Sequence, residues 1–215
     1  MAYDLEEQEQ IAALKAWWKD YGNLVAAGVA ACALTVAGWQ GWRYYQSSQA
    51  TAAVTLYEQL DRAEHAGDHK KVRDIAAEIT GKYGSTAYGA FAALSAARAS
   101  FNTGDLAGAK AQLQWVIDNA KDDEIRDVAR LRLAGVLLDE KNTDEALKLV
   151  EVKSGESMSG LYADLKGDIL FAQGKRTEAR SAYQLALDRS EAGSPYRATL
   201  QLKLDSLGET TPAGK

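Results

Sequence analysis

Proline is almost missing from this chain, and its scarcity is the first structural constraint. The 215 residues include two prolines, Pro195 and Pro212, so little interrupts a helix before the C-terminal end. Alanine is abundant and runs of β-branched residues are scarce, which favours helices over sheets. Because 47% of the residues are apolar and 26% are charged, the chain has the balance of a globular protein rather than a disordered or collagen-like one. The composition predicts an all-α protein.

Basic charge, cysteine and histidine are also in short supply. The net charge of −5 comes without clustered Lys and Arg, so we expect no nucleic-acid partner. The single cysteine, Cys32, cannot form an intramolecular disulfide and has no neighbours at metal-ligand spacing. His65 and His69 would share a helix face as metal ligands, but Gly67 is expected to end the helix between them. We therefore expect no metal and no cofactor.

The sequence offers no clear catalytic constellation. Neither a serine nor Cys32, which lies in an apolar segment, has a plausible base nearby. Asp164 and Asp168 stand at i and i+4, a spacing that fits a solvated helix face as well as acid–base chemistry. The stretch Gly174-Lys175-Arg176-Thr177 resembles the tail of a phosphate-binding loop, but without an upstream glycine and strand it fits a turn between helices. The sequence predicts a protein without enzyme activity.

A charge-free segment near the N-terminus is the strongest local feature. Residues 21–42 contain no charged side chain, and 22 residues of helix are long enough to cross roughly 30 Å of hydrocarbon. Aromatic residues stand at both borders of the segment, as at membrane interfaces: Trp17, Trp18 and Tyr21 on one side and Trp39, Trp42, Tyr44 and Tyr45 on the other. The pattern predicts a transmembrane helix in a lipid bilayer; the alternative is an alanine-rich core helix.

Two other membrane interpretations are less well supported. A cleaved signal peptide has a short basic start, whereas residues 1–20 form a polar, mainly acidic segment. The sequence Val29-Ala30-Ala31-Cys32 resembles a lipid-attachment box, but an apolar run follows where a mature lipoprotein turns polar. Two lysines before the span, against Arg43 after it, favour a cytoplasmic N-terminus.

The chain is thereby divided into four parts. Residues 1–20 are an amphipathic cytoplasmic segment, 21–42 a transmembrane helix, 43–207 a periplasmic helical domain and 208–215 a flexible tail. No linker follows Trp42, so the helix can continue past the membrane. Within the span, Ala33, Ala37 and Gly41 recur every fourth residue; such spacing lets a second transmembrane helix approach closely, although an Ala- and Gly-rich helix also shows it by chance.

A short sequence pattern, typical of a helix end followed by a turn and a new helix, repeats along the domain. The turn positions Gly67, Gly104, Lys141 and Gly174 are 37, 37 and 33 residues apart. A period of this length is typical of stacked helical hairpins. The spacing predicts three or four hairpins, with the helix after Ala146 cut short near Gly155 and a capping helix from Pro195 to Leu207.

The hairpins resemble tetratricopeptide repeats, whose unit places small residues where paired helices cross. The last unit matches best, with Gly167 at the crossing and Ala179, Tyr183, Ala186 and Leu187 on the buried stripe of its second helix. The alanine pairs Ala97 with Ala109 and Ala134 with Ala146 take the matching positions in two earlier units. The resemblance implies an all-α fold with an N-terminal transmembrane helix followed by a tetratricopeptide-like α-solenoid.

The whole chain resembles the YfgM-type family of bacterial inner-membrane proteins, ancillary subunits of the SecYEG translocon. Three motifs carry the resemblance: Asp4-Leu5-Glu6-Glu7-Gln8, Ala16-Trp17-Trp18-Lys19-Asp20-Tyr21-Gly22-Asn23 and Gly38-Trp39-Gln40-Gly41-Trp42-Arg43-Tyr44-Tyr45. The resemblance implies a cytoplasmic N-terminus, a periplasmic repeat domain and association with SecYEG. It also implies cooperation with periplasmic chaperones, among them a membrane-anchored peptidyl-prolyl isomerase-like chaperone, in handling unfolded translocating proteins.

The repeat pattern also indicates which residues face a binding groove. The candidates lie on the groove-lining face of the first helix of each unit: Phe91, Leu94, Arg98, Phe101, Asn102, Leu131, Leu138, Leu161, Asp164, Asp168 and Phe171. Packing in the core remains the alternative for each aromatic and leucine. Because Arg98 stands nearly alone among apolar and acidic residues, we do not expect a clamp for a terminal carboxylate, whereas a groove for a partner helix or an unfolded segment fits.

The sequence thus favours a non-enzymatic, singly spanning adaptor that recruits chaperones or emerging chains beside the translocon. Two rival functions remain open. One is a tetratricopeptide scaffold for another envelope complex unrelated to secretion, and the other is a structural anchor.

Overall fold

The computed structural model describes residues 2–208, and every regular element in that range is a helix. The all-α prediction is therefore confirmed. By its internal contacts the chain divides into two compact units, residues 1–49 and 50–215.

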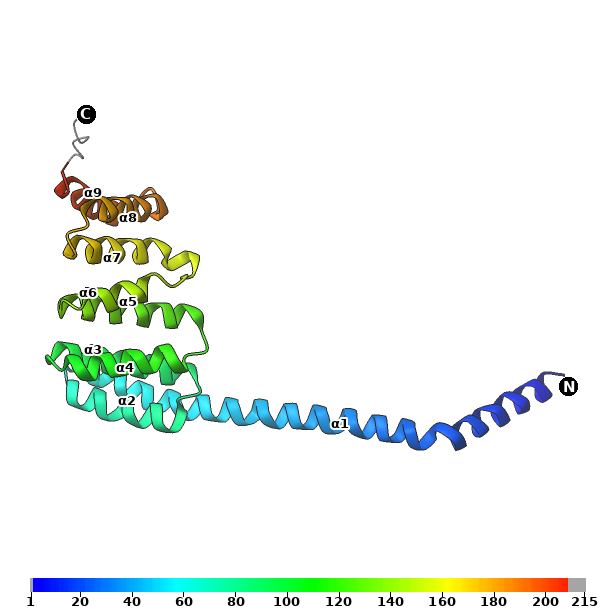
Figure 1. Cartoon of the computed structure of the whole chain (residues 1–215). Helices are drawn as coiled ribbons and strands as arrows, with labels where there is room; N and C mark the ends of the chain where they lie inside the picture. The colour runs from blue at the N-terminus through cyan, green and yellow to red at the C-terminus, as the bar shows by residue number, and fades with distance from the viewer. Residues whose placement is uncertain (1, 209–215) are drawn as a thin grey trace, which may run out of the picture. The chain divides into compact units, whose positions relative to one another are not determined.

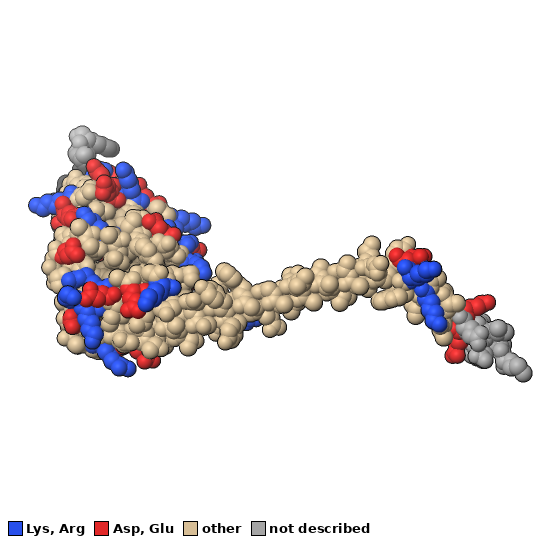
Figure 2. All heavy atoms as spheres, turned by 90° about the horizontal axis from the view of Figure 1, so that it is seen from below, with Lys and Arg blue, Asp and Glu red and all other residues tan. Residues whose placement is uncertain are grey.

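Helix α1 (Ala2–His65) contains the charge-free segment. It carries a window with a mean hydropathy of 1.5, of which 6% is buried, and no other helix in the described range is long and apolar enough to cross a membrane. Leu24 and Leu34 are each 74% exposed. Figure 2 shows the charge-free stretch of α1 as a run of tan side chains without the blue or red of charged residues. A buried core helix would cover these side chains with protein, so this exposure favours the membrane interpretation.

Helix α1 continues without a break past Trp42 to His65, as the lack of a linker predicts. Its last turns belong to the second unit. There Leu60 and Ala63 pack with Val72 and Ile79 of α2 (His69–Tyr83) in one buried cluster. The segment around Gly67 is therefore a full helical hairpin, the first of the stack.

The remaining helices stack in chain order (Figure 1). Their bounds are α3 (Ala87–Asn102), α4 (Leu106–Asn119), α5 (Asp123–Asp139), α6 (Thr143–Val150), a short 3-10 helix η1 (Glu156–Met158), α7 (Ser159–Ala172), α8 (Arg176–Arg189) and α9 (Tyr196–Ser206). Within residues 2–208 the helices form four hairpins, α1–α2, α3–α4, α5–α6 and α7–α8. Helix α9 follows the last hairpin, with Pro195 as its N-cap.

The four predicted turn positions share one backbone geometry. Gly67, Gly104, Lys141 and Gly174 have φ angles of 70°, 79°, 62° and 77°. After each of them the next residue donates its backbone N–H back to the preceding helix: Asp68 to Ala63, Asp105 to Ser100, Asn142 to Leu137 and Lys175 to Leu170, at 2.8–3.0 Å. This is the Schellman closure of a helix, which requires a left-handed residue and favours glycine.

Small residues lie where the helices of a hairpin cross, as predicted. A Cβ atom at Gly167 would overlap with the ring of Tyr183, so only a glycine leaves room for α8 against α7. Ala109, Ala134 and Ala146 are each 0% exposed in the corresponding places of earlier hairpins.

Helix α6 is short, as the sequence near Gly155 indicates, and Asp127 fixes the irregular segment that follows. The carboxylate of Asp127 accepts the backbone N–H of Gly155 at 2.8 Å and pairs with Arg130 at 2.9 Å. The hydroxyl of Tyr162 donates to the backbone carbonyl of Asp127 at 3.0 Å. The backbone N–H of Gly155 in this loop is thus satisfied by a carboxylate from inside the repeat stack.

Candidate protein-binding groove

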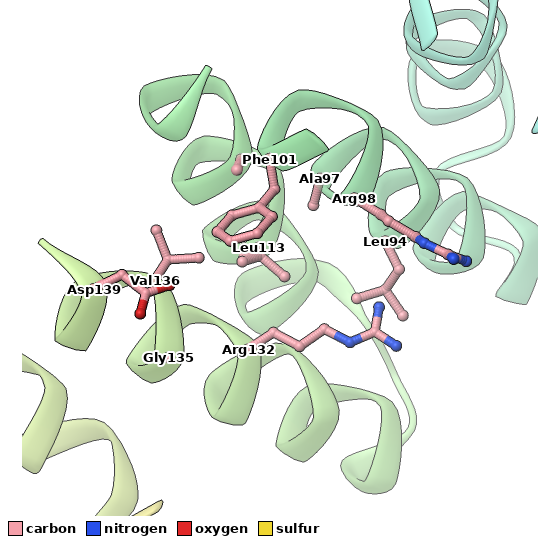
Figure 3. Close-up of a pocket in the computed structure, with 10 residues that line it drawn as sticks. Leu94, Ala97, Arg98, Phe101, Leu113, Arg132, Gly135, Val136 and Asp139 are labelled. Carbon is pink, nitrogen blue, oxygen red and sulfur yellow. The ribbon is translucent and has the colours of Figure 1, made fainter. Parts of the chain in front are cut away.

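A groove of about 410 Å³ lies between α3, α4 and α5. Three of the predicted binding residues, Leu94, Arg98 and Phe101, line it from α3. Its other lining residues come from α3, α4 and α5: Ala97, Ala109, Leu113, Arg132, Gly135, Val136 and Asp139. Figure 3 shows apolar side chains on the floor of the groove and charged groups towards its ends.

The charged groups of the groove are separated by sign. In Figure 3, Arg98 and Arg132 lie near Leu94 at one end, and Asp139 lies at the other end beyond Phe101 and Val136. All three charged side chains belong to exposed residues. None of them forms a hydrogen bond or ion pair with another residue in the range 2–208. Their charges are therefore available to a partner.

The expectation that Arg98 would stand nearly alone is wrong, because Arg132 lines the same groove. Arg132 is missed when the repeats are aligned on their turns. Arg98 precedes its turn, Gly104, by six residues, and the residue six before Lys141 is Gly135. The plain 34-residue spacing of tetratricopeptide repeats, which relates Arg98 to Arg132, is the signal that could have found it.

Other predicted binding residues lie outside this groove. Phe91 is 39% exposed and its ring contacts Tyr57, with centroids 6.3 Å apart. Leu138 is half-buried against the central core. Phe171 is 46% exposed, and the guanidinium of Arg176 lies 5.7 Å from its ring centroid.

Asp164 and Asp168 lie in an internal polar cluster. The ammonium of Lys203 on α9 pairs with Asp164 at 2.8 Å and with Asp168 at 2.7 Å. Tyr183 donates to Asp168 at 2.8 Å, and Tyr196 donates to Asp164. Asp164 is 8% exposed, so the expectation of a solvated face is wrong for this residue: its carboxylate holds α9 against α7.

Burial and contacts within the cluster shift the pKa values of its own side chains. Burial alone lowers the pKa of Lys203, but hydrogen bonds to both carboxylates outweigh burial, so that its pKa is raised. Burial, followed by the contact with Asp168, raises the pKa of Tyr183. These shifts favour the protonated cation and the neutral phenol that bind the carboxylates.

The two histidines are separated as predicted. Helix α1 ends at His65, α2 begins at His69, and Gly67 between them has a positive φ. Among the residues that the structure describes, no group of three or more His, Cys, Asp or Glu side chains could hold a metal ion.

The aromatic residues bordering the charge-free segment form two groups on α1. The rings of Trp17 and Tyr21 lie 5.7 Å apart, and those of Trp42 and Tyr45 lie 6.2 Å apart. All of the border aromatics are exposed: Trp17, Trp18, Tyr21, Trp39, Trp42, Tyr44 and Tyr45. Ala33, Ala37 and Gly41 are also exposed, and a Cβ at Gly41 would meet no atom within 4 Å.

Comparison with known proteins places the chain in a family. The model of the tetratricopeptide repeat-like domain matches residues 15–209. A protein of Neisseria gonorrhoeae named "Ancillary SecYEG translocon subunit" is 32% identical over 96% of this chain and 100% of its own length. Proteins with the same name from Haemophilus influenzae and Escherichia coli are each 30% identical, over 96% and 94% of this chain and 100% and 96% of their own lengths.

Among solved structures, the likeness extends to the fold alone. MamA of Desulfovibrio magneticus, residues 41 to the end, has a TM-score of 0.59 at 18% identity, over 72% of this chain and 82% of that one. A double mutant of MamA has a TM-score of 0.55 at 17% identity, over 72% and 93%. The family model and the relatives matched over nearly their whole length lead to one conclusion: this chain belongs to the tetratricopeptide repeat-like family of ancillary SecYEG translocon subunits.

Proposed function

We propose that this chain is a single-pass inner-membrane adaptor that associates with the SecYEG translocon. The observation that carries the proposal is that its similarity to ancillary SecYEG translocon subunits spans those relatives from end to end, so that it includes both the apolar helix and the repeat domain. A relationship of this extent favours a shared partner more strongly than a shared repeat fold does.

In this proposal, residues 1–20 are cytoplasmic, 21–42 span the membrane, and 43–207 form the periplasmic domain ahead of the tail 208–215. The two lysines before the span support this orientation. The exposed border aromatics lie at the membrane interfaces, and the face with Ala33, Ala37 and Gly41 contacts a neighbouring transmembrane helix. Protease added to right-side-out spheroplasts should degrade the repeat domain and spare the N-terminal segment, and the reverse pattern would contradict this orientation.

The repeat domain binds proteins and has no catalytic role of its own. The α3–α5 groove supports this role, because its lining combines an apolar floor with unpaired charges, which suits a polypeptide segment. The bound proteins are periplasmic chaperones, including a membrane-anchored peptidyl-prolyl isomerase-like chaperone, and newly translocated chains.

Purification of the tagged full-length chain in mild detergent tests the association. The proposal expects SecYEG subunits in stoichiometric recovery, with a periplasmic chaperone at lower yield. Recovery of a different stable envelope complex would support the alternative scaffold function, and recovery of no partner would support a simple anchor. Either of the latter results overturns the proposal.

Photocrosslinking in intact membranes tests the binding role of the repeat domain. A photoreactive amino acid in place of Phe91, Phe101 or Phe171 should crosslink to a translocon subunit, a chaperone or an emerging chain. The same amino acid at Lys121, which is exposed between α4 and α5, serves as the control. Equal products from Lys121 and from the phenylalanine positions would count against a localised binding surface.

A further inference from the structure

The α3–α5 groove has features that identify its partner more closely. Arg98 and Arg132 converge at one end without a carboxylate partner among residues 2–208, and Asp139 at the other end is equally unpaired. Buried or half-buried arginines elsewhere in the stack do have acceptors, as Arg130 does with Asp127 and Arg197 with the carbonyl of Leu187. Two unpaired guanidinium groups at the rim of an apolar floor are suited to a carboxylate.

The spacing of the charges matches one face of a helix. Arg132 and Asp139 are seven residues apart on α5, which is about 10 Å along the helix axis. Gly135 and Val136 lie between them at i+3 and i+4. A second helix lying beside α5 presents its own positions i, i+3, i+4 and i+7 to such a surface.

Gly135 keeps the groove open. It occupies the place, six residues before the turn, that holds Arg98 and Asp168 in the neighbouring hairpins. A Cβ there would meet no atom within 4 Å, although glycine within a helix costs about 0.5–1 kcal/mol relative to alanine. The absence of a side chain at Gly135 therefore leaves space for side chains of a partner. Packing within the stack does not require a side chain at this position.

We propose that the α3–α5 groove binds an amphipathic α-helical segment of a partner polypeptide. An acidic side chain of the segment pairs with Arg98 and Arg132, an apolar side chain packs on Leu94 and Phe101, and a basic side chain seven residues from the acidic one pairs with Asp139. The inference deepens the proposed function, on which it rests for the polypeptide nature of the partner. Arg98 also lines a neighbouring cleft with Glu64 and His69, so space continues beyond the arginine end of the groove. The proposal therefore takes the segment to be internal to its chain.

Peptide binding to the purified full-length chain in detergent tests the proposal. The probe is a fluorescein-labelled peptide, blocked at both ends and stapled as a helix on its far face. It carries glutamate, then leucine and phenylalanine three and four residues later, and lysine seven residues later. Matched peptides replace the glutamate with glutamine or lysine, and a further peptide lacks both charges but ends in a free carboxylate.

The glutamate peptide should bind about tenfold more tightly than the lysine-substituted one, with the glutamine peptide between them, as judged by fluorescence anisotropy. Arg98→Gln with Arg132→Gln should remove this preference. Gly135→Phe should abolish binding by filling the groove, whereas Gly135→Ala should retain it. Arg62→Gln, which changes an exposed arginine outside the groove, should also leave binding unchanged.

Three results would overturn the inference: no binding of the glutamate peptide, equal binding of all the peptides, or tighter binding of the peptide with the free terminal carboxylate. Circular dichroism of each variant shows whether it is folded, and Gly135→Ala provides a folded reference. The proposed function and this inference have independent tests. Recovery of SecYEG tests the proposed function, whereas binding of a synthetic peptide to the purified chain tests this inference.

Discussion

Individual glycines in this chain serve opposite purposes, and two of them form a matched test. Gly167 lies against Tyr183 at the crossing of α7 and α8, where a Cβ would overlap with the phenol ring. We expect Gly167→Ala to lower the free energy of unfolding by about 1–3 kcal/mol, because overpacking forces neighbouring side chains out of their rotamers. Denaturant unfolding of the full chain in detergent, followed by circular dichroism, measures this loss.

Gly135→Ala is the control for this change. It also places a methyl group within a helix, but the methyl has no neighbour within 4 Å. It should therefore raise the free energy of unfolding by about 0.5–1 kcal/mol through reduced backbone entropy of the unfolded chain. Equal effects of the two substitutions would show that packing at the crossing is not the reason for Gly167.

Lys141 is the turn residue that departs from the pattern. It has a φ of 62°, a left-handed conformation that the other three turns assign to glycine. Because a side chain in this conformation costs about 1–2 kcal/mol, Lys141→Gly should stabilise the chain by about 0.5–1 kcal/mol after the greater entropy of an unfolded glycine is counted.

The reverse change at an equivalent turn provides the comparison. Gly104→Ala, at a φ of 79°, should destabilise the chain by about 1 kcal/mol. The same denaturant titration measures both variants. A loss of stability in Lys141→Gly would mean that the lysine side chain contributes a contact that outweighs the backbone strain.

Tyr162 should make the repeat domain sensitive to alkaline pH. Burial, and then the adjacent Asp127 carboxylate, raise the pKa of this phenol from 10 to about 12. Between these pH values the folded chain holds a proton that the unfolded chain has lost. The stabilisation of the folded chain from this difference is complete below pH 10 and is lost as the pH rises through about 12. Unfolding titrations at pH 8, 10 and 11 should show a shallower loss for Tyr162→Phe than for the wild type, and parallel profiles would contradict this assignment.

At the scale of elements, α9 is held by charge as well as by apolar packing. Lys203→Met would leave the Asp164 carboxylate, which is 8% exposed, without its cation. We expect a loss of about 3 kcal/mol, since removing one partner of a buried pair strands the other charge. Hydrogen exchange should show faster exchange of the α9 amides than in the wild type.

Lys166→Met tests whether any lost lysine has this effect. Lys166 pairs with Glu151 at 3.4 Å across a more exposed surface, so its loss should cost at most about 1 kcal/mol. Adding Asp164→Asn to Lys203→Met should recover part of the lost stability, because the stranded charge is removed. If both lysine variants behave alike, the cluster does not anchor α9.

The elements that the sequence predicts well are those with local signals. The turns at Gly67, Gly104 and Gly174 follow from helix-ending glycines, and the short α6 follows from the sequence near Gly155. The polar cluster has no such signal: Lys203 is 39 residues from Asp164, and two carboxylates at i and i+4 look like a solvated face until α9 folds over them.

Only those residues of the groove that lie close together in the sequence were predicted. Leu94, Arg98 and Phe101 share one face of α3, so helical spacing alone brings them together. Arg132 and Asp139 join them only because α4 packs against both α3 and α5, and the turn alignment does not give the register of that packing. The sequence patterns of this chain therefore predict which residues share a helix face or a turn, but they do not predict the contacts between hairpins.

At the scale of the whole molecule, the average properties of the chain hide its division into unlike parts. The mean hydropathy of −0.32 is that of a soluble protein, yet a window of α1 reaches 1.5. The exposed side chains of that window include Val29, Leu34 and Val36. In water such a surface would favour aggregation, whereas in a bilayer the same surface is solvated by lipid.

If lipid surrounds the apolar segment of α1, charged residues in the middle of residues 21–42 should weaken its insertion into the membrane. Arg or Lys near the centre of a transmembrane helix costs about 2.5–3.5 kcal/mol per residue on insertion scales. Ala30→Arg combined with Ala33→Arg should therefore shift much of the protein from the carbonate-resistant membrane fraction to the soluble or degraded fraction. Ala111→Arg, an exposed position on α4, adds the same charge to the repeat domain and should leave the chain in the membrane. Full membrane retention of the double variant would indicate that residues 21–42 are not the anchor and that another surface holds the chain to the bilayer.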